Sequence, residues 1–206
     1  DYYDYSGTEV DYVGGADMQS YNVFDWNSYS KLTVGWVSPY VIDGSSDYAE
    51  ITLSAASLNG DCLIIPANYE TFNGSAFDEY FLIELFSPYG NNKKDWDYWS
   101  TNVNDLGEYG VRLYHVDSRL YSEKKGGETD EPDLYTYIGI NNSYNSSDYT
   151  CYEGWSDYKL LTLIQKSGKN TFGSTTSSNH TLSKDDLFQE GDVFTFSKYK
   201  HFLSKS

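Results

Sequence analysis

The chain has 206 residues, of which 31 are acidic and 14 basic, so its formal net charge at pH 7 is -17. A charge of this size and sign repels nucleic-acid phosphates and anionic membrane surfaces, and we exclude nucleic acid as a partner. The length suffices for one large or two small domains, and no run of about 18 apolar residues predicts a membrane-spanning segment.

The composition favours strands and ordered loops over helices. Aromatic residues make up 18% of the chain and Met occurs once, while richness in Tyr, Thr, Ser, Asn and Gly is typical of β proteins. Acidic, Tyr- and Asn-rich surfaces are common in secreted bacterial proteins. Because the first residue is charged, we expect any export signal upstream of Asp1, and a secreted or cell-surface location. Cys62 and Cys151 either form one disulfide or remain two buried free thiols.

The amino-terminal part predicts loop followed by one helix. Residues 1–24 lack a sustained period, whereas residues 25–36 predict a short amphipathic helix. Asp25 or Asn27 is the expected N-cap, and Gly35 marks the end. The aromatic face has helical spacing and consists of Trp26, Tyr29, Leu32 and Trp36.

Beyond residue 41 the pattern predicts strands, in an antiparallel β-sandwich-like module. The expected strands are 49–53, 62–65, 80–86, 110–116, 134–140, 158–165 and 193–196. The expected connections are 87–109, 121–133, 141–157 and 166–181. A helical turn is expected at 185–188, after Ser183. We place a domain boundary at residue 40, so that 1–40 and 41–206 form two units.

Five sequence blocks carry a family resemblance. They are residues 1–5 (DYYDY), 15–22 (GADMQSYN), 29–39 (YSKLTVGWVSP), 79–84 (EYFLIE) and 110–117 (GVRLYHVD). In this order and spacing they resemble the immune-inhibitor-A-like family of secreted bacterial zinc metallopeptidases. The resemblance covers residues 1 to about 120, and the stretch from residue 186 to 194 is similar, less distinctively, to the β-rich tail of such proteins.

The resemblance implies roles for three residues near the amino terminus. The zinc helix of the family reads His-Glu-x-x-His-x-x-Gly-x-x-Asp, and this chain contains no His-Glu-x-x-His. Asp1 matches the final Asp and is the candidate third zinc ligand; the alternatives are that Asp4 or a later acid serves, or that Asp1 is an ordinary charged residue. Met18 is expected in the turn beneath the zinc, and Tyr21 is the candidate transition-state stabiliser or a packed turn residue. Gln19 stands where such turns often have Met, which leaves an inactive pseudopeptidase open.

The implied function is that of the carboxy-terminal part of a zinc endopeptidase. The intact parent would hold zinc and cleave protein or peptide substrates, and its upstream catalytic subdomain would pack on this chain. The chain alone is expected neither to bind zinc tightly nor to hydrolyse peptides, since one carboxylate cannot replace two imidazoles. Oxygen-rich loops also admit calcium, although solvated carboxylates are the commoner explanation; the residues concerned are Asp1, Asp4, Asp11, Asp17, Asn22 and Asp25.

Two polar residues fall within predicted strands, Glu84 and His115. They form either a catalytic acid/base pair or structural buried polar groups. We favour the structural interpretation, because neither belongs to a nucleophile or metal-ligand pattern.

The alternative function is a non-catalytic module that binds carbohydrate or a surface. Exposed indole rings would serve as stacking platforms, and the candidates are Trp26, Trp96, Trp99 and Trp155. Aromatic residues in loops, however, more often anchor the loop to the core.

Overall fold

The computed structural model describes the chain in separate segments. The described residues are 13, 14, 17, 25–42, 48–93, 109–125, 135–140, 160–169, 171 and 182–199. For residues 121–125 and 135–140 the description covers the backbone alone.

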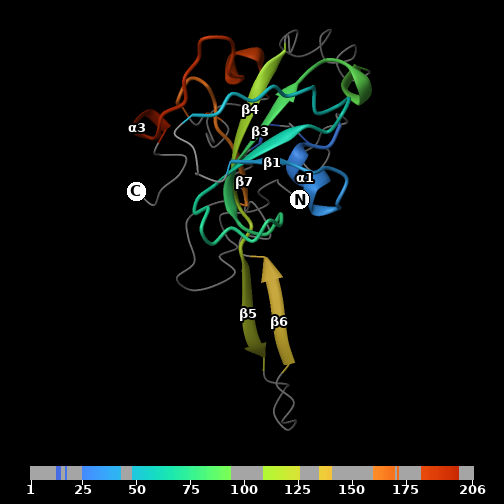
Figure 1. Cartoon of the computed structure of the whole chain (residues 1–206), viewed down its shortest axis with the longest axis vertical. Helices are drawn as coiled ribbons and strands as arrows, with labels where there is room; N and C mark the ends of the chain where they lie inside the picture. The colour runs from blue at the N-terminus through green and yellow to red at the C-terminus, as the bar shows by residue number, and fades with distance from the viewer. Residues whose placement is uncertain are drawn as a thin grey trace.

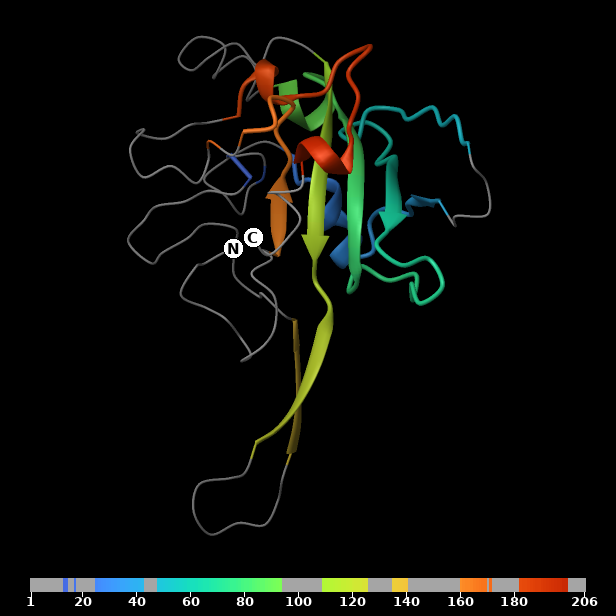
Figure 2. The same cartoon turned by 90° about the vertical axis from the view of Figure 1, so that its left-hand side faces the viewer.

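A five-stranded sheet forms the centre of the described structure (Figure 1). Its strands, in spatial order, are β1 (Tyr40–Val41), β2 (Cys62–Pro66), β3 (Glu79–Phe86), β4 (Gly110–Asp117) and β7 (Leu161–Leu163). β1 runs parallel to β2 and the other neighbours are antiparallel, so the sheet is mixed. Figure 2 shows β2, β3, β4 and β7 side by side. The predicted mainly-β fold, preceded by one short helix, is confirmed.

The two faces of the sheet carry separate hydrophobic cores. Register pairs Glu84 with Arg112 and Phe81 with His115, and paired residues share a face. Since residues 81 and 84 are an odd number of positions apart, the two pairs lie on opposite faces. The core on the Glu84 face includes Val13, Tyr29, Cys62, Ile64, Tyr80, Leu82, Tyr114 and Leu161. The core on the other face comprises Phe81, Leu113, Ile164, Phe188 and Tyr199.

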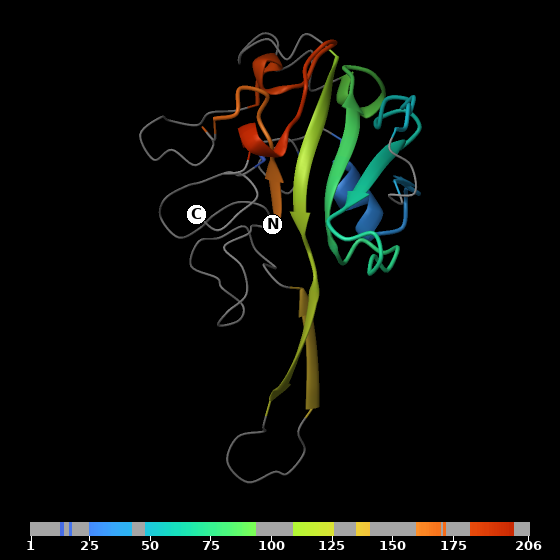
Figure 3. The same cartoon turned by 60° about the vertical axis from the view of Figure 1, so that its left-hand side comes forward.

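Short helical segments cover both faces. Helix α1 (Ser28–Thr33) lies on the Glu84 face, and α3 (Phe196–Tyr199) lies on the opposite one (Figures 1 and 3). Two turns of 3-10 helix, η2 (Gly90–Asn92) and η3 (Lys184–Asp186), lie in connections. The turn expected after Ser183 is therefore present as η3.

Helix α1 is shorter than the predicted 25–36 because both of its ends are fixed by local hydrogen bonds. Asn27 is the N-cap, and its side-chain oxygen accepts a hydrogen bond from the Ser30 amide at 2.9 Å. At the other end Gly35 has a φ of 74°, its amide donates to Leu32 O, and the Trp36 amide donates to Lys31 O. This pattern is a Schellman motif, which ends the helix before Trp36.

Most of the predicted strands form, and the exceptions have a structural reason. The strands expected at 62–65, 80–86, 110–116 and 134–140 are present, and 158–165 contains the shorter β7. The strand expected at 49–53 is absent. Just beyond this segment, Ala55 forms an isolated β-bridge with Leu85. The strand expected at 193–196 is also wrong, because α3 begins at Phe196.

A hairpin projects from the body of the molecule. β5 (Leu120–Lys125) pairs antiparallel with β6 (Tyr135–Ile140) in a separate two-stranded sheet, and all views show it extending away from the five-stranded sheet (Figures 1, 2 and 3). The prediction of residues 121–133 as a connection is thus wrong for 121–125. A second sheet facing the first, as in a sandwich, is not among the described residues.

The predicted boundary at residue 40 stays a prediction. Val13 and Tyr29, from the first predicted unit, are buried in the same cluster as Ile64 and Tyr114 from the second. The two units therefore share one core in the described structure.

Candidate functional site

The residues predicted to act at a metal site lie outside the described part of the chain. These are Asp1, Met18 and Tyr21. Trp96, Trp99, Trp155 and Cys151 lie outside it too, and of the proposed calcium ligands only Asp17 and Asp25 are described. The roles assigned to the undescribed residues stay predictions.

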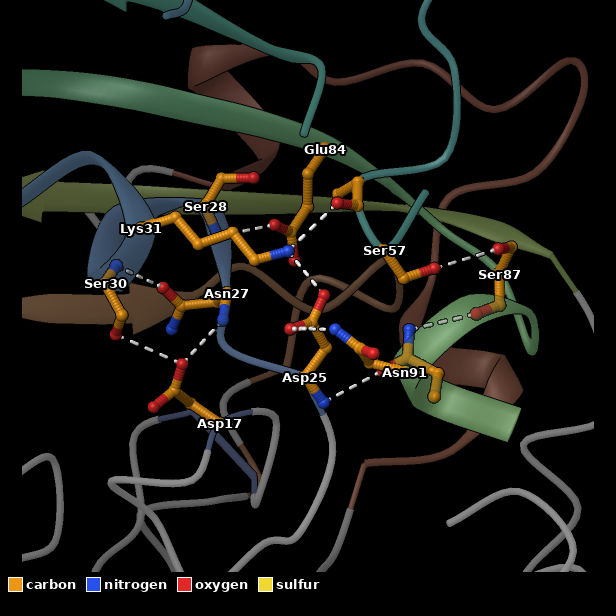
Figure 4. A network of polar contacts seen from close by, with 12 residues as sticks. Asp17, Asp25, Asn27, Ser28, Ser30, Lys31, Ser57, Glu84, Ser87 and Asn91 are labelled. Atoms are coloured by element: carbon orange, nitrogen blue, oxygen red, sulfur yellow. Dashed lines mark hydrogen bonds and ion pairs between the residues drawn. The ribbon is translucent and has the colours of Figure 1, made fainter. Parts of the chain in front are cut away.

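The described residues contain one dense polar network, which joins α1 to Asp17 and to β3 (Figure 4). Through Glu84 the network also reaches Arg112 of β4. The carboxylate of Asp17, fully buried, accepts hydrogen bonds from the Asn27 amide at 2.6 Å and the Ser30 hydroxyl at 3.1 Å. A carboxylate at this place also suits the positive end of a helix. These hydrogen bonds therefore hold Asp17 against the N-cap and the first turn of α1.

Lys31 and Asp25 form a second part of the network. The Lys31 ammonium binds the Asp25 carboxylate and donates to the Ala56 carbonyl at 2.9 Å. Asn91 donates to the other Asp25 oxygen at 3.3 Å, and Asn92 accepts from the Asp25 amide at 3.1 Å. Lys31 is 7% exposed, so these oxygen partners replace the water it loses. The ammonium ties α1 to the segment before β2.

Glu84 is the centre of the third part. Its carboxylate accepts hydrogen bonds from the Ser28 amide at 2.7 Å, from Arg112 at 3.3 Å and from the Tyr114 hydroxyl at 3.2 Å. The Arg112 guanidinium also lies 4.0 Å from the centre of the Phe86 ring. Glu84 is 2% exposed and is ion-paired with Arg112, which is the arrangement that makes a buried charge tolerable.

Two protonated groups adjoin this carboxylate. Burial, and then the charge of Glu84, raise the pKa of the Cys62 thiol to about 12. Burial, followed by the same charge, raises the pKa of Tyr114 well above its ordinary value. Both groups are thus neutral at physiological pH, and Cys62, a free thiol in the structure, is not a reactive nucleophile.

Glu84 and His115 do not meet, because they lie on opposite faces of the sheet. His115 Nε2 lies 3.1 Å from Glu79, whose other oxygen is 3.4 Å from Arg119. The His115 ring also packs near Phe81, with ring centres 5.8 Å apart. The two residues therefore are separately partnered buried groups, as in the structural interpretation, and cannot act together on one substrate.

No group of three or more His, Cys, Asp or Glu side chains within the described ranges is placed to hold a metal ion. A cavity of about 10 Å³ adjoins the network, and its lining includes Asp25, Trp26, Ser57, Asn92 and Arg112. This volume has room for about one water molecule and not for a substrate.

Sequence reasoning missed the partners of Glu84. Arg112 and Tyr114 belong to a block quoted for the family resemblance, yet their position opposite Glu84 depends on the register between β3 and β4. One feature of the sequence indicates such a partner. Arg112 and Tyr114 are two positions apart in a predicted strand and therefore share a face, where a buried carboxylate can accept hydrogen bonds from both side chains.

Comparison with known proteins adds no relative. No protein-family model, no curated protein and no solved structure matches this chain. As for membranes, the helices in the described segments all lack the length and apolar character needed to cross one.

Proposed function

We propose that this chain is the carboxy-terminal portion of a secreted zinc-dependent endopeptidase and is inactive on its own. The observation that carries the proposal is the ordered set of five blocks, residues 1–5, 15–22, 29–39, 79–84 and 110–117. In the intact protein an upstream helix provides two imidazole ligands and the base, and Asp1 completes the zinc set.

The polar network supports the proposal because it links four of these blocks. Asp17 from the second block accepts from Ser30 of the third. The helix that carries Ser30 begins at Ser28, whose amide donates to Glu84 of the fourth block, and Glu84 pairs with Arg112 of the fifth. Residues that carry the resemblance are thus among those that hold Asp17, the helix and the two central strands together. Such fastening is what a metal site needs beneath its ligands.

In this proposal the network has a supporting role and no chemical one. Glu84 already accepts hydrogen bonds from Ser28, Arg112 and Tyr114, and the neighbouring Tyr114 and Cys62 have raised pKa values. None of the three is placed to exchange a proton with a substrate at neutral pH. Asp17 accepts a hydrogen bond from the Asn27 amide, and it immediately precedes Met18, the residue assigned to the turn beneath the zinc.

The test compares zinc content and hydrolysis. The purified 206-residue chain is expected to lack stoichiometric zinc by elemental analysis and to leave casein intact, whereas the same chain extended upstream through its zinc helix gains both. Stoichiometric zinc together with chelator-sensitive casein hydrolysis by the 206-residue chain contradicts the proposal. An extended protein that binds zinc without cleaving any peptide is the pseudopeptidase that Gln19 leaves open.

A further inference from the structure

One tryptophan ring lies largely in solvent although it is held in place. The ring of Trp36 stacks on that of Trp26, with centres 4.8 Å apart and planes inclined by 12°. Trp36 nevertheless remains 68% exposed. An indole left in water forgoes most of the stabilisation that its burial would give, so the stack does not serve mainly to build the core.

Backbone hydrogen bonds fix the position of this stack from both ends of α1. Trp36 is the residue whose amide closes the Schellman motif, with a 2.9 Å bond to the Lys31 carbonyl. Trp26 immediately precedes Asn27, the N-cap, whose own amide is bound to the buried Asp17. Lys31 is itself anchored by Asp25, so the backbone that carries both rings is tied to the polar network. The aromatic surface is therefore preorganised, which lowers the entropy cost of binding a ligand to it.

The surroundings leave the Trp36 ring accessible. Gly35 beside it has open space, since a β-carbon built there would meet no atom within 4 Å. Ser38, two residues further along the chain, is exposed as well. A flat and accessible apolar ring suits a ring-shaped ligand that presents a C–H face to it.

We propose that Trp36, backed by Trp26, is a binding platform for a neutral saccharide, on which a pyranose ring stacks. The net charge of -17 disfavours anionic ligands, including single-stranded nucleic acids whose bases also stack on indoles. Two nearly parallel rings present a flat surface and not a cage, which disfavours a quaternary ammonium ligand. The platform is separate from the proposed zinc chemistry and does not depend on it.

The experiment titrates the 206-residue chain with three uncharged hexasaccharides, cellohexaose, chitohexaose and maltohexaose. Calorimetry gives the dissociation constant, and tryptophan emission reports stacking as a shift to shorter wavelength. At least one hexasaccharide is expected to bind. Trp36→Ala raises its dissociation constant about tenfold or more, as loss of an aromatic contact predicts, and abolishes the emission shift, whereas Trp36→Phe retains part of the affinity.

Tyr48→Ala is the matched control. Tyr48 is 76% exposed, more than Trp36, but its hydroxyl is bonded to the nearby Glu50. This variant is expected to bind like the unmodified chain, and circular dichroism checks that every variant is folded. The proposal is overturned if none of the three hexasaccharides binds, or if Trp36→Ala binds as tightly as the unmodified chain. It is also overturned if Trp36→Ala instead removes a concentration-dependent self-association, since the ring then belongs to a protein interface.

Discussion

Replacing Glu84 by alanine tests the buried network most severely. The substitution removes the acceptor for three donors and leaves the Arg112 guanidinium, 3% exposed, without its counter-charge. Loss of one member of a buried ion pair costs about 3–5 kcal/mol. Since a domain of this kind is stable by roughly 5–15 kcal/mol, we expect Glu84→Ala to lose about a fifth or more of the free energy of unfolding.

Urea denaturation followed by circular dichroism measures this loss. The control is Glu50→Ala, which removes an exposed carboxylate that accepts a hydrogen bond from the Tyr48 hydroxyl at 3.3 Å. This variant should change the free energy of unfolding by no more than about 0.5 kcal/mol. A double variant, Glu84→Met with Arg112→Met, should lose less of the free energy of unfolding than Glu84→Ala, because both members of the buried ion pair are removed together. If Glu84→Ala costs less than about 1 kcal/mol, like the control, the carboxylate is hydrated and the network does not hold α1 to the sheet.

Three further predictions concern single groups. Burial raises the pKa of the Cys62 thiol to about 12, so in a Cys151→Ser variant this thiol should resist Ellman's reagent until urea unfolds the chain. Equal rates of reaction with the reagent in native and unfolded protein would contradict the burial of Cys62. Burial raises the pKa of Tyr29 from 10.0 to about 12, so the neutral phenol stabilises the fold fully below pH 10.0 and this stabilisation is lost as pH rises towards about 12. The urea midpoint of the unmodified chain should fall over this pH range, and that of Tyr29→Phe should fall less steeply. Identical slopes for the two proteins would contradict the raised pKa of Tyr29. Asn27→Ala removes the N-cap oxygen of α1 and should lower the free energy of unfolding by about 1 kcal/mol, and an unchanged urea midpoint would mean that the cap is dispensable.

The central strands could be predicted because their sequence leaves little choice. β3 and β4 are covered on both faces, so their dense apolar runs fit only interior strands. The alternation of residues 49–53 looked equally regular, yet a strand also needs a neighbour to pair with, and β1 occupies the edge of β2 instead. Pattern alone does not say which segment takes an edge.

Polar and short elements escaped prediction for related reasons. β5 has the polar sequence Ser-Glu-Lys-Lys within it, which has low strand propensity, and its backbone pairs with that of β6. The left-handed conformation of Gly35 ends α1 at Thr33, three residues earlier than the aromatic spacing suggests. Glu84 and His115 were foreseen as buried polar groups, but their partners depend on sheet register, which a single sequence does not specify.

The central claim, that this chain belongs behind a zinc helix, is tested most directly by the coding sequence immediately upstream of Asp1. We predict that it encodes His-Glu-x-x-His-x-x-Gly-x-x in frame, so that Asp1 becomes the last residue of the motif and the candidate third ligand. An upstream reading frame without a His-Glu-x-x-His sequence at that spacing would contradict the account, and would leave the network of Asp17, Glu84 and Arg112 as the framework of a protein with another function.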